Sequence, residues 1–332
     1  VNKASGSVSL NSDLTINNTL TFTKGNIVTG ANRVILESGS SVSGASQSTG
    51  WVEGYMKRHV ATGTSVSRSF AVGSASYYAP VSVQFATVSS AGYAEASTYD
   101  NDHSELDYSG IDDAKSVNRY WLLSNLSVGF TSASATFNWE TSNMDAGSNT
   151  TIFRSGLYNG SAWTILSASS PLSNSVVANN ITSFGEFAVG EKLGRSTWTG
   201  NNMTSNWFTP KNWHGGVPAS DMDALIPDGL TGGRLYPILT GSTGVVKDVS
   251  VEANASLVIN AGTLQIGGAI TNAGTLSATD GTVEFNGSLA QTIPAGVFNG
   301  NKIMNLIVSN DLSIAGTDSI TGTLSIAQGK TL

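Results

Sequence analysis

The most acidic stretch of the chain, residues 100–113, contains the side chains best suited to binding a metal ion. Ca²⁺ takes roughly six to eight oxygen ligands, which several carboxylates in one loop could supply. An EF-hand register fails, because the twelfth position counted from Asp100 is Ile111, where a bidentate Glu belongs. Two interpretations stay open: a solvated loop between strands, which we favour, and a calcium site formed by Asp100, Asp102 and Asp107. A second, smaller acidic group comprises Asp221, Asp223 and Asp228.

Three tryptophans, Trp198, Trp207 and Trp213, gather in a short segment. Aromatic faces stack on other rings and on cations, and they stack on sugar rings in the same way, so Trp207 and Trp213 are candidates for glycan contact. The alternative makes the trio the small core of a segment that is poor in other apolar residues. We favour the core, because the surrounding Pro and Gly residues leave little else to bury.

Catalytic motifs are absent from the sequence. The histidines, His59, His103 and His214, lie far apart, and none stands in a metal-binding or triad spacing such as H-E-x-x-H. No serine nucleophile elbow occurs, and no G-x-G fragment opens a helix as phosphate binding requires. The absence of cysteine excludes thiolate nucleophiles and zinc-thiolate sites. The residues predict a protein that is not an enzyme and has no cofactor besides the candidate calcium.

Composition limits the partners. Only 12% of the 332 residues are charged, about half the usual share of roughly 25%, so Ser, Thr, Asn and Gly must supply the polar surface. The net charge is −7 and no basic run occurs, which argues against nucleic acid as a partner. No apolar stretch approaches the roughly 20 residues that span a bilayer, so we expect no membrane insertion.

Short alternating β-branched and aromatic runs between Gly, Asn and Ser turns predict an all-β protein. In residues 1–50 and 245–332 these runs recur closely, as expected for parallel β-solenoid coils stacked about 4.8 Å apart. The sequence NAGTL at residues 260–264 recurs at 272–276, a second sign of a repetitive coil. We therefore predict parallel β-solenoid segments at both ends of the chain.

Two regions with different sequence patterns lie between these solenoids. Residues 51–192 contain longer alternating runs whose number and spacing predict a central antiparallel β-sandwich. Residues 193–244, rich in Trp and Pro, are interpreted as an irregular module that caps the second solenoid and links it to the sandwich. Such a cap would cover an exposed sheet edge and prevent unwanted pairing.

The two ends of the chain resemble each other at a constant offset of 304 residues. Without gaps, Ser9 aligns with Ser313, Ile16 with Ile320, and Leu20 with Leu324. We interpret the chain, which begins with Val rather than Met, as an excerpt of a tandem array whose period is near this offset, with adjacent copies of the same repeat as its partners.

Six segments of the chain carry a resemblance to a known group of proteins: GWVEGYMKRHVATGTSVSRSFAVGSASYYAPVSVQFATVSSAGY, GIDDAKSVNRYWLLSN, ITSFGEFAVGE, TWTGNNMTSNWFTPKNWHGGVPASDMDALIPDG, YPILTG and GTVEFNGSLAQTI. Through them most of the chain resembles repeat modules of very large secreted cell-surface proteins of the Bacteroidetes, many of them cargo of the type IX secretion system and some gliding-motility adhesins. This resemblance implies an extracellular location and no catalytic residues. Asp318-Ser319-Ile320 is similar to the site at which Bacteroidetes attach O-linked glycans, which makes Ser319 a candidate for O-glycosylation.

The expected function is therefore a structural or adhesive unit of an extracellular array, which would meet surface glycans or other cells. One alternative is a carbohydrate-binding module of a secreted polysaccharide-utilisation protein. Another is a β-helix polysaccharide lyase, an enzyme class that carries charged clusters along one solenoid face. The few acidic residues in the second solenoid argue against the lyase.

Overall fold

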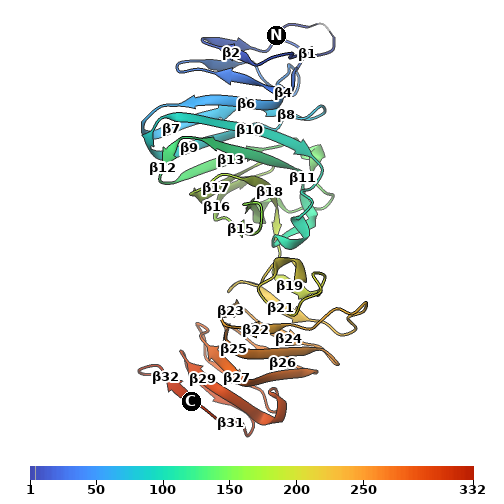
Figure 1. Cartoon of the computed structure of the whole chain (residues 1–332), viewed down its shortest axis with the longest axis vertical. Helices are drawn as coiled ribbons and strands as arrows, with labels where there is room; N and C mark the ends of the chain where they lie inside the picture. Colours follow the sequence, from blue (N-terminus) through green and yellow to red (C-terminus); the bar gives the residue numbers. More distant parts are fainter. Residues whose placement is uncertain (4) are drawn as a thin grey trace. The chain divides into compact units, whose positions relative to one another are not determined.

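The computed structural model describes residues 1–3 and 5–332, and within them every long element is a β-strand (Figure 1). The all-β prediction is confirmed, and so are the stacked coils of a β-solenoid. The chain divides into two compact units. Unit 1 comprises Val1–Leu106 and Ile111–Lys192, and unit 2 comprises Asp107–Gly110 and Leu193–Leu332. Short 3₁₀ helices interrupt the strands at η1 (Leu106–Tyr108), η2 (Thr141–Asn143), η3 (Thr150–Ile152), η4 (Pro210–Asn212) and η5 (Asn299–Asn301).

Unit 1 begins with coils whose strands run parallel. In the first coil, β1 (Val8–Ser9) and β2 (Leu14–Ile16) both pair with β4 (Ile27–Leu36), and β3 (Thr19–Thr21) pairs with β5 (Ser41–Ser43). The register places Leu14 opposite Val34 and Leu20 opposite Val42, so apolar side chains stack from coil to coil. This stacking explains why short apolar runs recur so closely in the sequence.

The coils continue into a larger sheet without a break. β4 pairs in parallel with β6 (Val52–Val60), which pairs antiparallel with β10 (Gly92–Asp100). The same sheet extends through β11 (Ile111–Leu126), β18 (Glu186–Lys192), β14 (Phe153–Tyr158) and β15 (Trp163–Ile165), while β8 (Val72–Gly73) pairs with β6. The backbone hydrogen bonds therefore run from the parallel coils into antiparallel strands.

A second antiparallel sheet shares the core of unit 1. The ring centroid of Phe137, on this sheet, lies 5.1 Å from that of Trp121 and 5.0 Å from that of Phe187, both of which are on the first sheet. All three side chains are fully buried. The two sheets thus bury their facing side chains against each other. The second sheet contains β7 (Gly63–Phe70), β9 (Val81–Ser90), β12 (Gly129–Phe130), β13 (Ala133–Asn138), β16 (Ala168–Leu172) and β17 (Ser175–Ile181).

Unit 2 is a stack of parallel strands apart from one antiparallel pair, that of β19 with β20, and its later coils are drawn in orange and red (Figure 1). Leu257 lies opposite Leu276 and Leu264 opposite Val283, so these two coils are 19 residues apart and the similarity at a 12-residue shift is not the coil length. The strands of unit 2 are β19 (Arg195–Trp198), β20 (Trp213–His214), β21 (Asp223–Ile226), β22 (Ile238–Thr240), β23 (Thr243–Val246), β24 (Val249–Val251), β25 (Ser256–Ile266), β26 (Ile270–Asn272), β27 (Thr275–Phe285), β28 (Gln291–Ile293), β29 (Lys302–Val308), β30 (Leu312–Ile314), β31 (Ser319–Ile320) and β32 (Leu324–Ile326).

The core of unit 2 is formed by the side chains that point inward from each strand. Buried and half-buried residues alternate through much of β25 and β27, with Leu257, Leu264 and Phe285 fully buried. β-Strand side chains point alternately to the two faces, so one face of each coil fills the interior. Among the described residues, no helix is long and apolar enough to cross a membrane.

Candidate functional site

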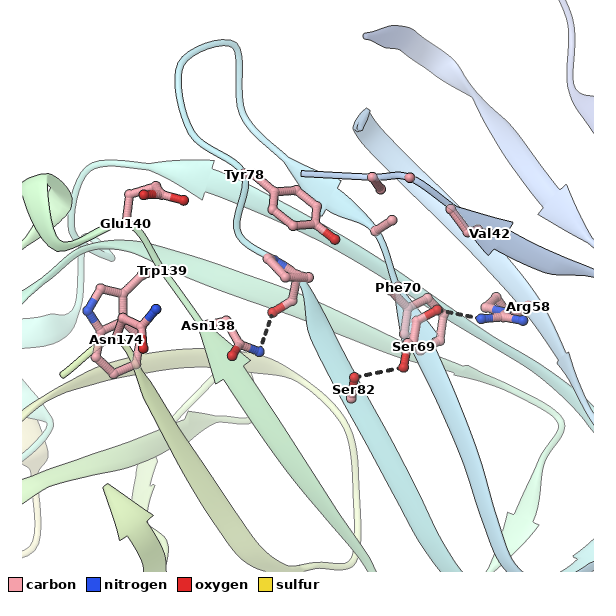
Figure 2. A pocket seen from close by; sticks show the side chains of 14 residues that line it. Val42, Arg58, Ser69, Phe70, Tyr78, Ser82, Asn138, Trp139, Glu140 and Asn174 are labelled. Carbon is pink, nitrogen blue, oxygen red and sulfur yellow. Dashed lines mark hydrogen bonds between the residues drawn. The ribbon is translucent and has the colours of Figure 1, made fainter. Parts of the chain in front are cut away.

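A pocket of about 490 Å³ opens in unit 1 beside the junction of coil and sheet (Figure 2). Its volume lies within the range of roughly 300–1,000 Å³ that small-molecule sites occupy. The lining residues come from segments far apart in the sequence: β5 and its following turn, β6, β7, β9, the end of β13 and the turn before β17. The pocket therefore exists only in the folded unit.

One side of the pocket is held by Arg58 and two serines. Arg58 donates to the Ser69 carbonyl at 2.6 Å and to the Ser40 carbonyl at 3.0 Å, which fixes its guanidinium (Figure 2). The Ser69 and Ser82 hydroxyls lie 2.8 Å apart. Burial lowers the pKa of Arg58, and the nearby charge of Arg68 lowers it further. This side thus presents an immobilised cation and a pair of hydroxyls.

The rest of the lining carries polar groups without a hydrogen-bond partner among the described residues. The Glu140 carboxylate, the Asn174 amide and the Tyr78 hydroxyl line the pocket, and none has a hydrogen-bond partner within residues 1–3 and 5–332. Figure 2 shows Glu140 and Asn174 beside Trp139, a buried residue whose backbone N–H donates to the Asn174 backbone carbonyl at 3.1 Å. Burial raises the pKa of the Tyr78 phenol, so its hydroxyl is neutral over the ordinary pH range.

The chemistry of this pocket is recognition by hydrogen bonds. It offers donors on Arg58 and Asn174, an acceptor on Glu140, and an aromatic ring on Tyr78, with one charge of each sign. Such a set suits a neutral ligand that carries several hydroxyl groups, because each hydroxyl both donates and accepts. Within the described residues the hydroxyls of Ser69 and Ser82 bond only to each other, and neither is hydrogen-bonded to the Glu140 carboxylate that also lines the pocket.

The structure places the candidate calcium ligands in separate surroundings. Asp100 pairs with the buried guanidinium of Arg119 at 2.8 Å, and Asp102 accepts a hydrogen bond from the Ser116 hydroxyl at 3.0 Å. Asp107 belongs to unit 2, whereas the other two belong to unit 1. Within the described part of the chain, no group of three His, Cys, Asp or Glu side chains is arranged to hold a metal ion.

The smaller acidic group is also dispersed. Asp223 pairs with Lys247 at 3.0 Å, and Asp228 accepts from the Asn254 amide at 3.2 Å. The backbone N–H of Asp228 donates to Glu252 at 3.0 Å. Asp221 has an interaction partner of its own. These side chains therefore have separate local roles.

Trp207 and Trp213, the candidates for glycan contact, are fully buried together with Trp198. The ring centroids of Trp207 and Trp213 lie 4.7 Å apart, and those of Trp198 and Trp213 lie 5.0 Å apart, both edge to face. The Trp213 indole N–H donates to the Trp207 carbonyl at 2.7 Å. Because their faces pack inside unit 2, these rings present no surface on which a sugar could stack.

Ser319, the candidate for O-glycosylation, is an exposed residue at the start of β31. Its neighbour Asp318 is different, since both of its carboxylate oxygens lie out of solvent contact with no hydrogen-bond partner in residues 1–3 and 5–332. Burial raises the pKa of Asp318. The exposed Ser319 is therefore accessible for modification, whereas burial disfavours the charged form of the neighbouring Asp318 carboxylate.

One polar cluster has no counterpart in the sequence motifs. His103 is buried among Tyr120, Tyr158 and Trp163, with ring centroids about 5 Å from each, and its Nε2 lies 2.9 Å from a carboxylate oxygen of Glu186. The Glu105 backbone N–H donates to Nδ1 at 3.0 Å, so Nε2 carries the proton and donates to Glu186. The two partners are 83 residues apart in the sequence, and no local spacing could have linked them.

No protein-family model matches this chain, and no curated protein or solved structure matches it either.

Proposed function

We propose that this chain is a non-catalytic structural and adhesive unit of a long extracellular surface protein, one repeat of a tandem array. The observation that carries the proposal is the stacking of parallel coils at both ends of the chain, each hydrogen-bonded to the next along its strands. A coil stack can be lengthened by adding coils, because each coil contacts only its neighbours. A fold that can be lengthened in this way is well suited to a long structural protein.

Within this proposal the two facing sheets of unit 1 form a β-sandwich that acts as a spacer or binding head. The Trp-rich segment would cap the stack of unit 2. In support of the cap, β19 and β20 lie at one end of the five-stranded sheet that continues through β21 and β24. A covered edge cannot pair with other chains, which keeps such a protein from aggregating.

We further propose that the parent protein belongs to the Bacteroidetes, reaches the cell surface by type IX secretion and takes part in adhesion or gliding. The sequence resemblance supports the lineage and location. The low share of charged residues and the net charge of −7 support partners other than nucleic acid. The partners would be adjacent copies of the repeat, surface glycans or other cells.

Protease treatment of intact cells that produce the chain tests this proposal. We expect mass spectrometry to find peptides of this chain among those released before lysis. Detection only after lysis would contradict the extracellular location. Cleavage of pectin or alginate by the purified chain would contradict the non-catalytic role.

The pocket of unit 1 favours a second function, the binding of a saccharide. Glu140, Asn174 and the Tyr78 hydroxyl line it without partners in the described part of the chain, so they are available to a ligand rich in hydroxyl groups. Trp207 and Trp213 are buried and do not belong to this proposed saccharide site.

A glycan array compares the parent chain with Glu140→Gln and Asn174→Ala. Both variants change pocket side chains that make no hydrogen bond to the described part of the chain, so we expect lost binding with unchanged melting temperature. Asn201→Ala is the control, because Asn201 is exposed in unit 2. Equal binding by all four chains, or by none, would set this second function aside.

A further inference from the structure

The last coil of unit 2 repeats the strand layout of the first coil of unit 1. At the offset of 304 residues, β30 (Leu312–Ile314) falls on residues 8–10, where β1 lies, because 312 − 304 = 8. β31 falls on residues 15–16, within β2, and β32 falls on residues 20–22, over β3. The sequence similarity between the two ends of the chain thus coincides with the same three-strand plan.

The corner that follows these strands is also the same. Gly25 follows β3 with φ of 93°, and Gly329, at the same offset, follows β32 with φ of 74°. Both lie in the left-handed region, which glycine adopts at little cost. The first and last coils therefore agree in the positions of their strands and of this turn, although β1 and β2 share the partner β4 whereas β31 and β32 share the partner β29.

The two coils differ in what covers them. Leu20 and Phe22 in the first coil are 6% and 2% exposed, and β5 lies on β3 with Leu20 opposite Val42. Their equivalents in the last coil, Leu324 and Ile326, are 44% and 43% exposed. The last coil thus leaves open an apolar surface that the next coil covers in unit 1.

The backbone of the last coil is open on the same side. β30 pairs with β28, and both β31 and β32 pair with β29, in each case the preceding coil. No strand of the described residues occupies their other edges. In the first coil those edges hold β4 and β5 in parallel register.

We propose that the coil Leu312–Ile326 is a seat for the segment Ile27–Ser43 of a second copy of this chain. The register of unit 1, transferred by the offset, places Ile27 opposite Leu312, Leu36 opposite Ile320 and Val42 opposite Leu324. In a tandem array the last coil of one copy then serves as the first coil of the next, and no linker separates them. This inference rests on the proposed array and adds the position of its joint.

A two-copy chain tests the seat directly. Residues 1–326 are joined to residues 23–332, so that Ile326 replaces Phe22 and the offset of 304 is kept. Amide hydrogen exchange is followed in the peptide that crosses the joint, whose sequence occurs once in the tandem chain. We expect exchange in Leu312–Ile326 to slow by roughly a hundredfold or more relative to the single chain, since these amides pass from an open edge into a stack.

The matched variant carries Leu324→Asp and Ile326→Asp in the first copy alone. In the single chain these side chains are exposed, so the same double change should leave its melting temperature nearly unaltered. In the tandem chain it should abolish the protection. Equal exchange in the tandem and single chains would overturn the seat, and so would protection that survives the double change.

Concentration-dependent protection in the single chain would show whole chains associating at this surface, and it too would overturn the in-line joint. The test is independent of cellular location. If the tandem chain shows no protection at the joint but the protein lies on the cell surface, the seat is wrong and the proposed function stands. If the joint is protected but the protein stays in the cytoplasm, the seat stands and the proposed extracellular function is wrong.

Discussion

Arg119 shows how unit 1 accommodates a charge in its interior. Its side chain is fully buried, and the guanidinium contacts Asp100 at 2.8 Å, the Thr98 hydroxyl at 3.1 Å and the Asn143 side-chain carbonyl. Burial lowers the pKa of Arg119, while the charge of Asp100 and its hydrogen bond act in the opposite direction. Asp100 therefore acts as a counter-ion in the fold.

Replacing Asp100 with Ala should destabilise unit 1, because it leaves a buried cation without its partner. We expect a loss of about 2 kcal/mol, below the roughly 3–5 kcal/mol of a fully buried pair, since the Asp100 side chain is 39% exposed. Urea denaturation measures the change. Asp113→Ala is the control, because the Asp113 carboxylate makes no hydrogen bond or ion pair within residues 1–3 and 5–332. Equal losses in both variants would refute this role for Asp100.

Asp318 presents the opposite case, a carboxylate without a counter-ion or hydrogen-bond donor among the described residues. Asp318→Asn should stabilise unit 2 by up to about 1 kcal/mol at pH 7, because it removes the charge that burial penalises. The folded pKa of Asp318 is raised, so the protonated acid favours the fold below about pH 4 and this advantage is lost as pH rises through the folded pKa.

The gain from Asp318→Asn should therefore be largest near neutral pH and small near pH 4. Thermal unfolding of both chains across this range measures it. Asp311→Asn is a poor comparison, because Asp311 accepts two hydrogen bonds from Thr331, whereas Asp280→Asn changes an exposed acid and serves as the control. A gain that grows as pH falls would contradict the assignment.

Sequence reasoning at this scale found residue types but not their partners. Beside the favoured solvated loop, a calcium site of Asp100, Asp102 and Asp107 was the alternative, and the structure gives Asp100 and Asp102 each a protein partner. Arg119 and Glu186 went unnoticed, since a buried ion pair and a His–Glu hydrogen bond leave no local pattern. The core interpretation of Trp207 agrees with its burial, because the composition of its segment already limited what could be buried.

At the scale of elements, the corners of the coils set strict limits. Gly6, Gly25 and Gly50 lie one above another with φ of 75°, 93° and 132°. A Cβ on Gly50 would lie well inside van der Waals distance of the Gly25 carbonyl. Stacked backbones approach each other most closely at such corners, and only glycine leaves room.

Gly50→Ala should cost about 3 kcal/mol, from backbone strain and from overpacking against Gly25. The control Gly39→Ala meets the strain alone, because φ there is 81° but nothing lies within 4 Å of the added Cβ, and it should cost roughly 1 kcal/mol. Chemical denaturation compares the two variants. Equal costs would show that close packing between coils does not matter at this corner.

The elements themselves were largely readable in the sequence. Alternating apolar residues mark β25 and β27, and the close spacing of short runs predicts parallel coils, because each coil must bury its own face. The coil length was not readable from the NAGTL similarity, since residues 260–264 and 272–276 fall in different parts of their coils. The pairing of β4 with β6 likewise depends on contacts that no local pattern encodes.

At the scale of the whole molecule, the chain passes between two compact units more than once. Asp107–Gly110 belongs to unit 2 although the residues on both sides of it belong to unit 1. Composition could not reveal this excursion, because four residues carry no periodicity of their own. Unit 1 ends at Lys192, where the sequence changes from long alternating runs to a segment rich in Trp and Pro.

Two units with separate cores should unfold as two transitions in calorimetry. Phe137 lies in the core of unit 1 and Phe285 in that of unit 2, and both are fully buried. Phe137→Ala should lower one transition and Phe285→Ala the other, each by roughly 10 °C, because truncating a buried Phe costs about 3–5 kcal/mol. If either substitution shifts both transitions equally, the units share one cooperative core, and the division of the chain into independently stable parts is wrong.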